Sequence, residues 1–408
     1  MACTLITSIG TGMYKEGYRK TCYQFADGDK VETAWFLQAL LNKKYREFEK
    51  VILIGTKTSN WDSLIDLDDS DAEELWEKVS VLNQNKQGIS EELITPLEEQ
   101  LKKQYSIPFK IIVHTDLIDT DTCSEVFGAY NKIIPEISPK SDVLFDVTHG
   151  FRTMPILMYQ NLQFLFSNNI SRKIEIVYGE YIKDREISFV RDLTNFWTLG
   201  QIKDAKDLFE KKLDGFKLAE LIKGYWTKGS KAIKSLSEIV QTNFSLQIFE
   251  VARQIKNAIA AYPKNAPVWL SNIKAILESL VAIIDENHKA RSLYNYSKFL
   301  YEHNLNVQAV ITLQVAVEAA VVSAYHDENK LGDYEWWQDQ GKPFLKEQKK
   351  KSRKDLRIPL TNLESFRNQI AHGGGKNQEG NYPMASNIPG IFQSGIRGVE
   401  NLLEELQL

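Results

Sequence analysis

The sequence predicts an α/β N-terminal domain with a mostly parallel sheet, followed by an all-α connector and an all-α C-terminal domain. Two observations support this prediction. Short apolar runs that end in small polar residues alternate with helical stretches as far as residue 194, and from residue 195 only helical periodicity continues. With 408 residues, of which 43% are hydrophobic, the chain is long enough to bury more than one core.

Composition limits the classes of partner. A formal net charge of -4 argues against a chain coated in basic residues, so any contact with nucleic acid is expected to be local. Three widely separated cysteines fit neither a disulfide framework nor a CxxC metal site, which predicts a cytoplasmic protein without a metal. The longest apolar stretch, 307–325, contains Glu318. Because a carboxylate at mid-membrane costs about 2.5 kcal/mol or more, this stretch is expected to be a buried helix and not a membrane span.

The N-terminal elements alternate in type. Strands are predicted at residues 4–9, 51–54, 110–114, 143–147 and 173–178, with a small hairpin at 18–25. Helices are predicted at 31–41, 71–82, 90–104, 124–134 and 155–166. Strand, helix and strand repeated in this way imply a parallel sheet covered on both faces, with ligands at the carboxyl ends of its strands.

The most informative strand end is the stretch 146–155. A buried strand passes through Thr148 into a helix start that contains Arg152 and Thr153. Free backbone N–H groups, a guanidinium and hydroxyl donors at such a turn suit an anionic ligand. The alternative is a tight strand-to-helix turn in which Asp146 acts only as a cap. Neither GxxxxGK[ST] nor a GxGxxG that opens a helix is present.

Three motifs together resemble the CARF domain of type III CRISPR ancillary proteins. They are residues 8–14, residues 54–56 and, most specifically, DVTHGFRTMP at 146–155. The resemblance implies that residues 1–194 form a Rossmann-like sensor domain that dimerises and binds a cyclic oligoadenylate, with cyclic tetra-adenylate the commonest choice in similar proteins. The ligand-binding residues that it implies are Ser8, Gly10, Thr11, Gly12, Gly55, Thr56, Ser59, Thr148, His149, Gly150, Phe151, Arg152 and Thr153.

His149 stands where some relatives have a glycine. Whether its ring stacks, binds phosphate or helps to cleave the ligand stays open.

Residues 195–291 are predicted to form a helical connector. Helical periodicity covers 196–221, 230–239, 246–261 and 266–285. A helix-turn-helix DNA reader is the competing interpretation, but lysines here are interspersed with acidic residues, which favours an ordinary solvated surface.

The segment 292–408 begins with the apolar helix 307–325, on which Gln314 and Glu318 share one face. Buried polar groups need partners, and Arg367 is a candidate partner for Glu318; a simple hydrogen-bonded pair is the alternative. A local basic run then follows, formed by Lys342, Lys346, Lys349, Lys350, Lys351, Arg353, Lys354 and Arg357. This run could guide a polyanion through phosphate contacts, or be a lysine-rich loop.

Arg367, Asn368 and His372 then occur within one short helical stretch that ends at Gly373. A guanidinium supplies permanent positive charge and an imidazole can transfer a proton near neutrality, which together suit phosphodiester chemistry. A helix C-cap, with the histidine near the negative end of the helix dipole, is the structural alternative.

Arginine followed by a polar residue and then histidine, in an all-helical domain, resembles the HEPN ribonuclease signature. The resemblance implies that Arg367, Asn368 and His372 cleave single-stranded RNA without metal or cofactor, leaving a 2′,3′-cyclic phosphate and a 5′-hydroxyl. On an ideal helix Arg367 and His372 lie about 140° apart, so a homodimer or higher homo-oligomer that pairs two such helices is expected to complete the site. The alternative function is a ligand-sensing transcriptional regulator with a non-catalytic C-terminus.

Overall fold

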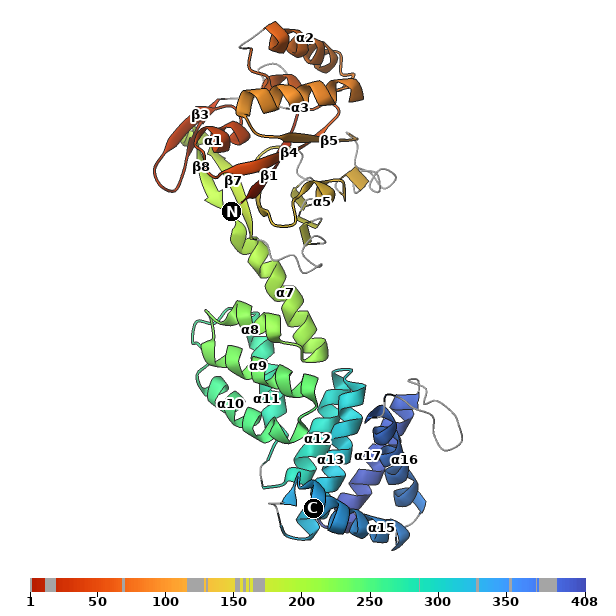
Figure 1. The fold of residues 1–408 in the computed structure, drawn as a ribbon. Helices are drawn as coiled ribbons and strands as arrows, with labels where there is room; N and C mark the ends of the chain where they lie inside the picture. The colour runs from red at the N-terminus through yellow and green to blue at the C-terminus, as the bar shows by residue number, and fades with distance from the viewer. Residues whose placement is uncertain are drawn as a thin grey trace. The chain divides into compact units, whose positions relative to one another are not determined.

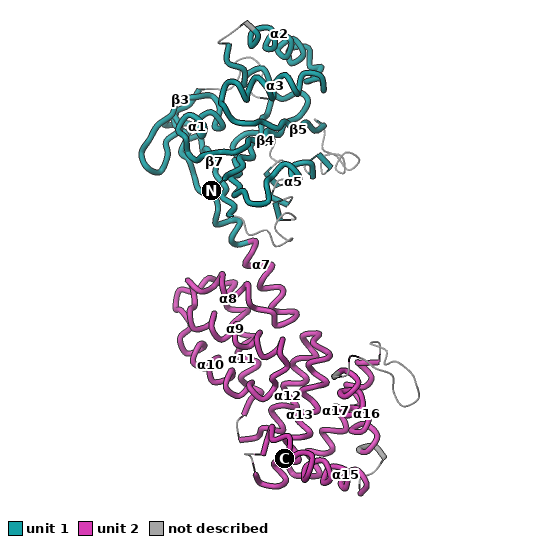
Figure 2. The backbone as a smooth tube through the Cα atoms, viewed as in Figure 1, with its two compact units in different colours: residues 1–199 teal, residues 200–408 magenta. Residues whose placement is uncertain are grey.

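The computed structural model divides the chain into two compact units, residues 1–199 and 200–408 (Figure 2). It describes residues 2–11, 20–67, 70–115, 128–129, 131–150, 155–156, 159–160, 162–163, 173–285, 287–327, 330–351, 354–371, 373 and 387–408. The boundary falls within helix α7 (Thr194–Lys212). The predicted connector and the predicted C-terminal domain therefore lie in the same compact unit.

The first unit is built on an eight-stranded sheet (Figure 1). Its strands are β1 (Cys3–Ile9), β2 (Thr21–Gln24), β3 (Lys30–Thr33), β4 (Phe48–Thr56), β5 (Phe109–His114), β6 (Asp142–Asp146), β7 (Ile174–Ile182) and β8 (Ile187–Asp192). Their order is β3-β2-β8-β7-β6-β1-β4-β5. The five strands from β7 to β5 run parallel, while β8 is antiparallel to β7 and β3 is antiparallel to β2.

Two hydrophobic cores cover the two faces of this sheet. Every residue of β1 is buried, and alternate side chains enter different cores: Leu5 and Ile9 enter one, and Ile6 enters the other. The helical elements around the sheet are α1 (Phe36–Asn42), η1 (Trp61–Leu64), α2 (Ser70–Gln84), α3 (Glu91–Tyr105), α5 (Ile133–Glu136) and η2 (Lys183–Arg185). The predicted α/β class, with a mostly parallel and doubly covered sheet, is confirmed.

Two N-terminal predictions were wrong in detail. The predicted helix at 31–41 begins as strand β3, because Val31 pairs with Tyr23 of β2 across an antiparallel hairpin. Only from Phe36 is the chain helical. That hairpin also replaces the one predicted within 18–25. Strand β8 was not predicted at all. Most of the predicted helices at 124–134 and 155–166 lies outside the described residues.

The second unit is helical, as predicted. Its described elements after α7 are α8 (Phe216–Ile222), α9 (Thr227–Thr242), η3 (Ser245–Gln247), α10 (Ile248–Ala260), α11 (Leu270–Ala282), α12 (Lys289–Glu302), α13 (Asn306–Ala324), α14 (Tyr334–Trp336), the π-helical turn η5 (Trp337–Gly341), α15 (Lys342–Lys351), α16 (Lys354–Ala371) and α17 (Ile388–Glu405). The helix predicted at 196–221 is broken between α7 and α8. Leu213 there has φ +52, and a Cβ on Gly215 would lie 2.3 Å from Ile233 Cγ2, so this turn requires a glycine.

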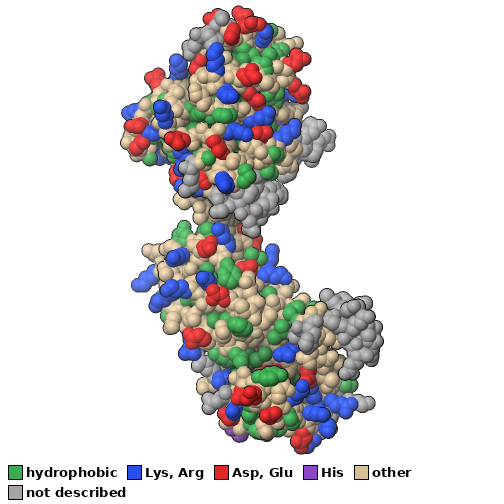
Figure 3. Space-filling view, viewed as in Figure 1, with side chains coloured by type: hydrophobic (Ala, Val, Ile, Leu, Met, Phe, Trp, Pro, Cys, Tyr) green, Lys and Arg blue, Asp and Glu red, His purple; other side chains and the backbone are tan. Residues whose placement is uncertain are grey.

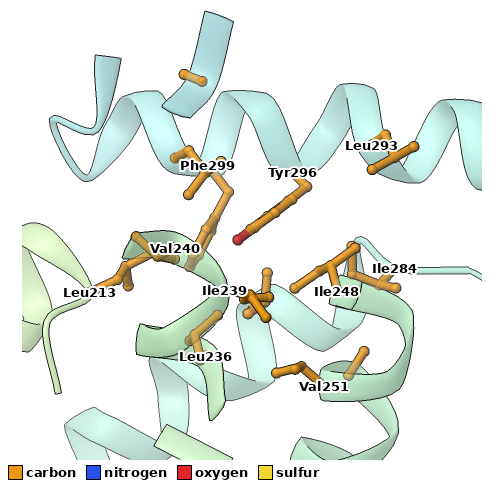
Figure 4. Close-up of a cluster of buried hydrophobic side chains, with 14 of the residues drawn as sticks. Leu213, Leu236, Ile239, Val240, Ile248, Val251, Ile284, Leu293, Tyr296 and Phe299 are labelled. Carbon is orange, nitrogen blue, oxygen red and sulfur yellow. The ribbon is translucent and has the colours of Figure 1, made fainter. Parts of the chain in front are cut away.

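One hydrophobic core runs through this unit and crosses residue 291, where a domain boundary was predicted. Figure 4 shows Tyr296 and Phe299 of α12 beside Ile239 and Val240 of α9, with Ile248 of α10 nearby. The connector helices and the C-terminal helices therefore bury their apolar faces together.

Helix α13 lies at the centre of the C-terminal helices and packs against α12, α16 and α17 (Figure 1). By length and composition it is the one helix among the described residues that could cross a membrane, yet 61% of the apolar window is buried within the protein. This burial is what a core helix shows. Helices α16 and α17 can approach closely because Gly398 has no Cβ. A Cβ at that position would lie only 2.7 Å from Pro359 Cβ.

Candidate functional site

The first candidate site is the carboxyl edge of the sheet, where the order of the strands reverses. β1 lies between β4 and β6, and all three are parallel. Open α/β sheets bind ligands at such a switch point. Gly10 and Thr11 follow β1, and residues 147–150 follow β6. The hydroxyl of Ser8 donates to the backbone carbonyl of His149, which joins the two strand ends.

Asp146 organises the turn after β6. Its Oδ2 accepts a hydrogen bond from the Thr7 hydroxyl at 2.6 Å, and its Oδ1 accepts from the Thr148 N–H at 2.8 Å. The Thr148 hydroxyl in turn accepts from the Gly179 N–H of β7 at 2.8 Å. Complete burial raises the pKa of Asp146 to about 6. One buried carboxyl group therefore couples β1, β6 and the turn, and through Thr148 it reaches β7.

The His149 side chain points into the protein. Its Nε2 accepts a hydrogen bond from the backbone N–H of Phe36, the first residue of α1, at 3.1 Å. Its ring meets Trp35 edge to face with centroids 5.1 Å apart. Burial lowers the pKa of His149 to about 4, so the ring is neutral at pH 7. The ring thus fastens the turn to the start of α1 by satisfying an N–H that the helix leaves unpaired.

Acidification is expected to weaken the wild-type protein relative to a His149→Gln variant. Because the folded-state pKa of His149 lies below the unfolded value of 6.5, its stabilising contribution is complete above pH 6.5 and is lost down to about pH 4. Asp146 has the opposite effect, because its folded-state pKa lies above the unfolded value. Its contribution to the free energy of unfolding is complete below pH 3.8 and is lost as the pH rises to about 6. The two effects oppose each other in the wild type, whereas the variant retains only that of Asp146.

The free-energy advantage of the wild type over His149→Gln should therefore shrink by up to about 3 kcal/mol between pH 7 and pH 4. Denaturant unfolding of the N-terminal unit at a series of pH values measures this difference. A difference that does not change with pH would refute the assigned role of the ring.

Gly55, Thr56 and Ser59, the predicted ligand-binding residues at the end of β4 and just after it, are held in place by hydrogen bonds and close packing. The Thr56 N–H donates to Ser59 Oγ at 2.9 Å, and the Ser59 hydroxyl donates to the Ile9 carbonyl at 2.9 Å. Both side chains are fully buried. A Cβ on Gly55 would lie 2.5 Å from the Trp61 ring. These three residues are therefore buried and fix the conformation of the chain at the carboxyl ends of β1 and β4.

The other predicted ligand residues divide into two groups. Gly10, Thr11, Thr148 and Gly150 lie at the edge itself, where Thr11 and Thr148 are partly accessible and Gly150 is exposed with φ +105. Gly12, Phe151, Arg152 and Thr153 lie outside the described residues.

The second candidate site lies on helix α16. Its core face carries the buried residues Leu360, Leu363 and Phe366, which leaves Arg367 and Asn368 exposed. Arg367 Nη1 donates to Asn368 Oδ1 at 3.2 Å. Within the described ranges, no carboxylate oxygen is found within 4 Å of the Arg367 guanidinium. His372, the third predicted residue of this site, lies outside the described residues.

Arg367 and Asn368 line a pocket of about 360 Å³. Its other lining residues are Gln314, Glu318, Val322, Lys330, Leu331, Gly332, Asp333, Tyr334, Trp337, Gln338, Lys342 and Glu364. The sequence had not pointed to the segment 330–338. The feature of the sequence that could have indicated this segment is the aromatic pair Tyr334 and Trp337, which lies in a polar stretch just ahead of the basic run.

Glu318 reaches this pocket from α13. Burial raises its pKa, while the nearby Arg367 charge and a hydrogen bond from Gln314 lower it in part. The two partners considered from the sequence are thus both present: Gln314 as a hydrogen-bond partner and Arg367 as a nearby charge. No Glu318–Arg367 ion pair is seen among the described side chains.

The described residues of the basic run lie on α15 and the start of α16, while Arg353 lies outside the described residues. Figure 3 shows Lys and Arg side chains gathered over α15. Lys349 is paired with Glu364 at 2.8 Å, and Lys351 with Glu347 at 2.5 Å. Lys342, Lys346 and Lys350 are exposed. The helical α15 replaces the lysine-rich loop that was the alternative, so these ammonium groups stand on a regular element beside the pocket.

Comparison with known proteins bears on the N-terminal unit. The family model for the CARF domain of the CRISPR system endoribonuclease Csx1 matches residues 4–197. A CRISPR-associated protein of Methanocaldococcus jannaschii, MJ1674, is 25% identical over 282 residues, covering 63% of this chain and 44% of that protein. The chain thus spans less than half the length of this curated relative.

Among solved structures, Enterococcus italicus Csm6 bound to cyclic hexa-2'-fluoro-hexa-dAMP aligns with a TM-score of 0.39 and 11% identity, covering 100% of this chain and 94% of that one. A similarity at that level carries no argument about function. The family match shows a CARF domain at residues 4–197, and together with the CRISPR-associated relative it supports a CARF-containing CRISPR ancillary protein.

Proposed function

We propose that this protein is an endoribonuclease of antiviral CRISPR defence that cuts single-stranded RNA when a cyclic oligoadenylate binds its CARF domain. It acts in the cytoplasm and needs no metal. The observation that carries the proposal is the exposed Arg367 guanidinium, bonded to Asn368 beside a polar pocket, in a chain whose other unit is a CARF domain. A fixed charge at a pocket edge suits a phosphodiester.

The proposed chemistry is attack by the substrate's own 2′-hydroxyl. The 2′-oxygen loses its proton to a base and bonds to phosphorus, the bond from phosphorus to the 5′-oxygen breaks, and the leaving oxygen takes up a proton. A 2′,3′-cyclic phosphate and a 5′-hydroxyl result. Arg367 stabilises the charge on the phosphorane oxygens, His372 moves a proton, and Asn368 holds the guanidinium through its Oδ1.

The activator site in this proposal is the carboxyl edge of the sheet. Thr11, Thr148 and Gly150 form its accessible part, Gly10 lies buried beside them, and Arg152 supplies charge. The arrangement is a homodimer, because a cyclic ligand with two-fold symmetry suits two copies of one edge. Pairing of two α16 helices also completes the catalytic site from both chains.

The proposal is tested by cleavage of a labelled single-stranded RNA by the full chain in EDTA, with cyclic oligoadenylates of three to six adenylates added one at a time. One ring should activate cleavage. The 5′ fragments, which carry the cyclic phosphate at their 3′ ends, should resist phosphatase until that phosphate is opened by acid. Cleavage that requires a divalent metal would contradict the mechanism. Ligand-responsive binding to a specific DNA, with no RNA cleavage, would favour the transcriptional regulator instead.

Lys349 is expected to keep Arg367 available for the substrate. Glu364 lies three residues before Arg367 on the same helix face, and pairing with Lys349 at 2.8 Å holds its carboxylate. In Lys349→Ala that carboxylate is free to pair with Arg367, which should lower kcat about 3- to 5-fold, the size of a surface ion pair.

The double variant Lys349→Ala with Glu364→Gln should regain most of this activity, because no competing carboxylate remains. The matched control is Lys350→Ala on the exposed side of α15, which should change only the salt dependence of RNA binding. Failure of Glu364→Gln to rescue kcat would show that Lys349 acts in another way.

A further inference from the structure

We propose that the pocket beside Arg367 is a nucleobase subsite, in which one unpaired base next to the cleaved phosphodiester stacks on Trp337 and Tyr334. This inference rests on the proposed ribonuclease function and names the part of the RNA that the pocket holds. It assigns the pocket a role in choosing the cleavage position, separate from the bond-breaking role of Arg367.

The aromatic wall is the first observation. Tyr334 of α14 and Trp337 of η5 line the same pocket as Arg367 and Asn368 of α16. The Tyr334 side chain is 73% exposed, so packing does not explain its position. Stacking on aromatic side chains is the general way in which proteins hold unpaired bases.

The backbone presents Trp337 to the pocket through a π-helical turn. A Cβ on Gly341 would lie 2.4 Å from Trp337 Cε3 and 3.0 Å from Trp336 Cζ3. The Trp337 ring therefore lies over Gly341, in space that any larger residue would fill. Single π-helical turns are rare and occur frequently at functional sites. This packing orders one side of the ring, and the ring also borders the pocket.

The charges around the pocket suit a base attached to a phosphate chain. Asp333 accepts from the Trp336 N–H at 3.0 Å and pairs with Lys330 at 3.2 Å. Glu364 is held by Lys349. Asp333 and Glu364 are thus compensated, and burial raises the pKa of Glu318, the third carboxyl group of the lining. Lys342 and Arg367 add positive charge at the pocket, and the amide of Gln338 can bond to a base edge.

The test uses short RNAs with a single cleavable linkage, flanked by 2′-deoxynucleotides, in which one base at a time is replaced by an abasic site. With wild-type protein and its activating adenylate ring, loss of the base at one flanking position should lower kcat/KM about 5- to 100-fold. Trp337→Ala should cleave the intact and abasic substrates at nearly equal rates, while Trp337→Phe keeps most of the preference.

Two further variants separate stacking from folding. Gly341→Ala places a methyl group against the Trp337 ring and should reduce the preference for the base in part. Trp336→Ala is the matched control, since that ring packs on Tyr325 at 5.4 Å between centroids and does not line the pocket. It should keep the wild-type preference.

Each outcome has a defined meaning. If the wild type cleaves RNA but shows no base preference at any position, or if Trp337→Ala keeps the wild-type preference, the subsite is refuted while the ribonuclease stands. If the wild type cleaves no RNA with any ring, the proposed function fails and the subsite fails with it.

Discussion

Replacing Arg367 with alanine is expected to lower kcat for RNA cleavage by about 100- to 1,000-fold, the effect of removing one donor to a developing oxyanion. The guanidinium is exposed, bonded only to Asn368 Oδ1 among the described side chains, and borders the pocket. It can therefore turn toward a phosphate without breaking a stabilising ion pair. For the same reason the free energy of unfolding should change by less than about 0.5 kcal/mol.

Single-turnover cleavage with saturating activator measures this effect separately from RNA binding. Arg367→Lys should be intermediate, because an ammonium group keeps the charge but loses the planar fork of donors. Arg253→Ala is the matched control: Arg253 is an exposed arginine of α10 paired with Glu250 at 2.8 Å. A loss below about fivefold in Arg367→Ala would correspond to only about 1 kcal/mol and would remove Arg367 from the catalytic site.

Replacing Asp146 with alanine is expected to weaken both the CARF fold and its response to activator. The substitution leaves the Thr7 hydroxyl and the Thr148 N–H without their acceptor inside the protein. Such unsatisfied buried groups should destabilise the N-terminal unit by about 2 kcal/mol or more. Because the β6 turn loses its anchor, about tenfold more activator should be needed for half-maximal cleavage, equivalent to 1.4 kcal/mol of binding energy.

Asp146→Asn separates charge from shape. The amide keeps an acceptor for the Thr148 N–H and avoids an ionised group whose pKa burial has raised to about 6, so its stability at pH 7 should be near that of wild type. Asp142→Ala, at the start of the same strand, is the control, since that carboxylate accepts from the Lys173 N–H away from the turn. Normal activation of Asp146→Ala would contradict this account.

Much of the fold could be predicted because buried parallel strands are short apolar runs with polar ends. β1, β4, β5, β6 and β7 all follow this pattern. The predictions of secondary structure were wrong where tertiary contacts determine the backbone conformation. Val31 extends because Tyr23 lies opposite it, and the break after α7 depends on the approach of Ile233 to Gly215. Neither contact is visible in a local pattern.

The sites could be predicted in location but less well in detail. The polar ends of β1, β4 and β6 indicated one sheet edge, and the strand order brings them together. The sequence left the role of His149 open because the inward turn of its ring depends on Phe36, more than a hundred residues away. Likewise, Trp337 gains its place through a π-helical turn over Gly341, which hydrophobic periodicity does not reveal.

The central claim is that activator binding at the CARF domain turns on cleavage at Arg367, Asn368 and His372. Its most direct test follows calorimetric binding of the activating adenylate ring and single-turnover RNA cleavage on the same preparation. The account predicts that both saturate over the same concentration range, and that His372→Ala binds the ring with unchanged affinity but cleaves no RNA. Saturable binding with no change in the cleavage rate, or equally fast cleavage without the ring, would contradict it.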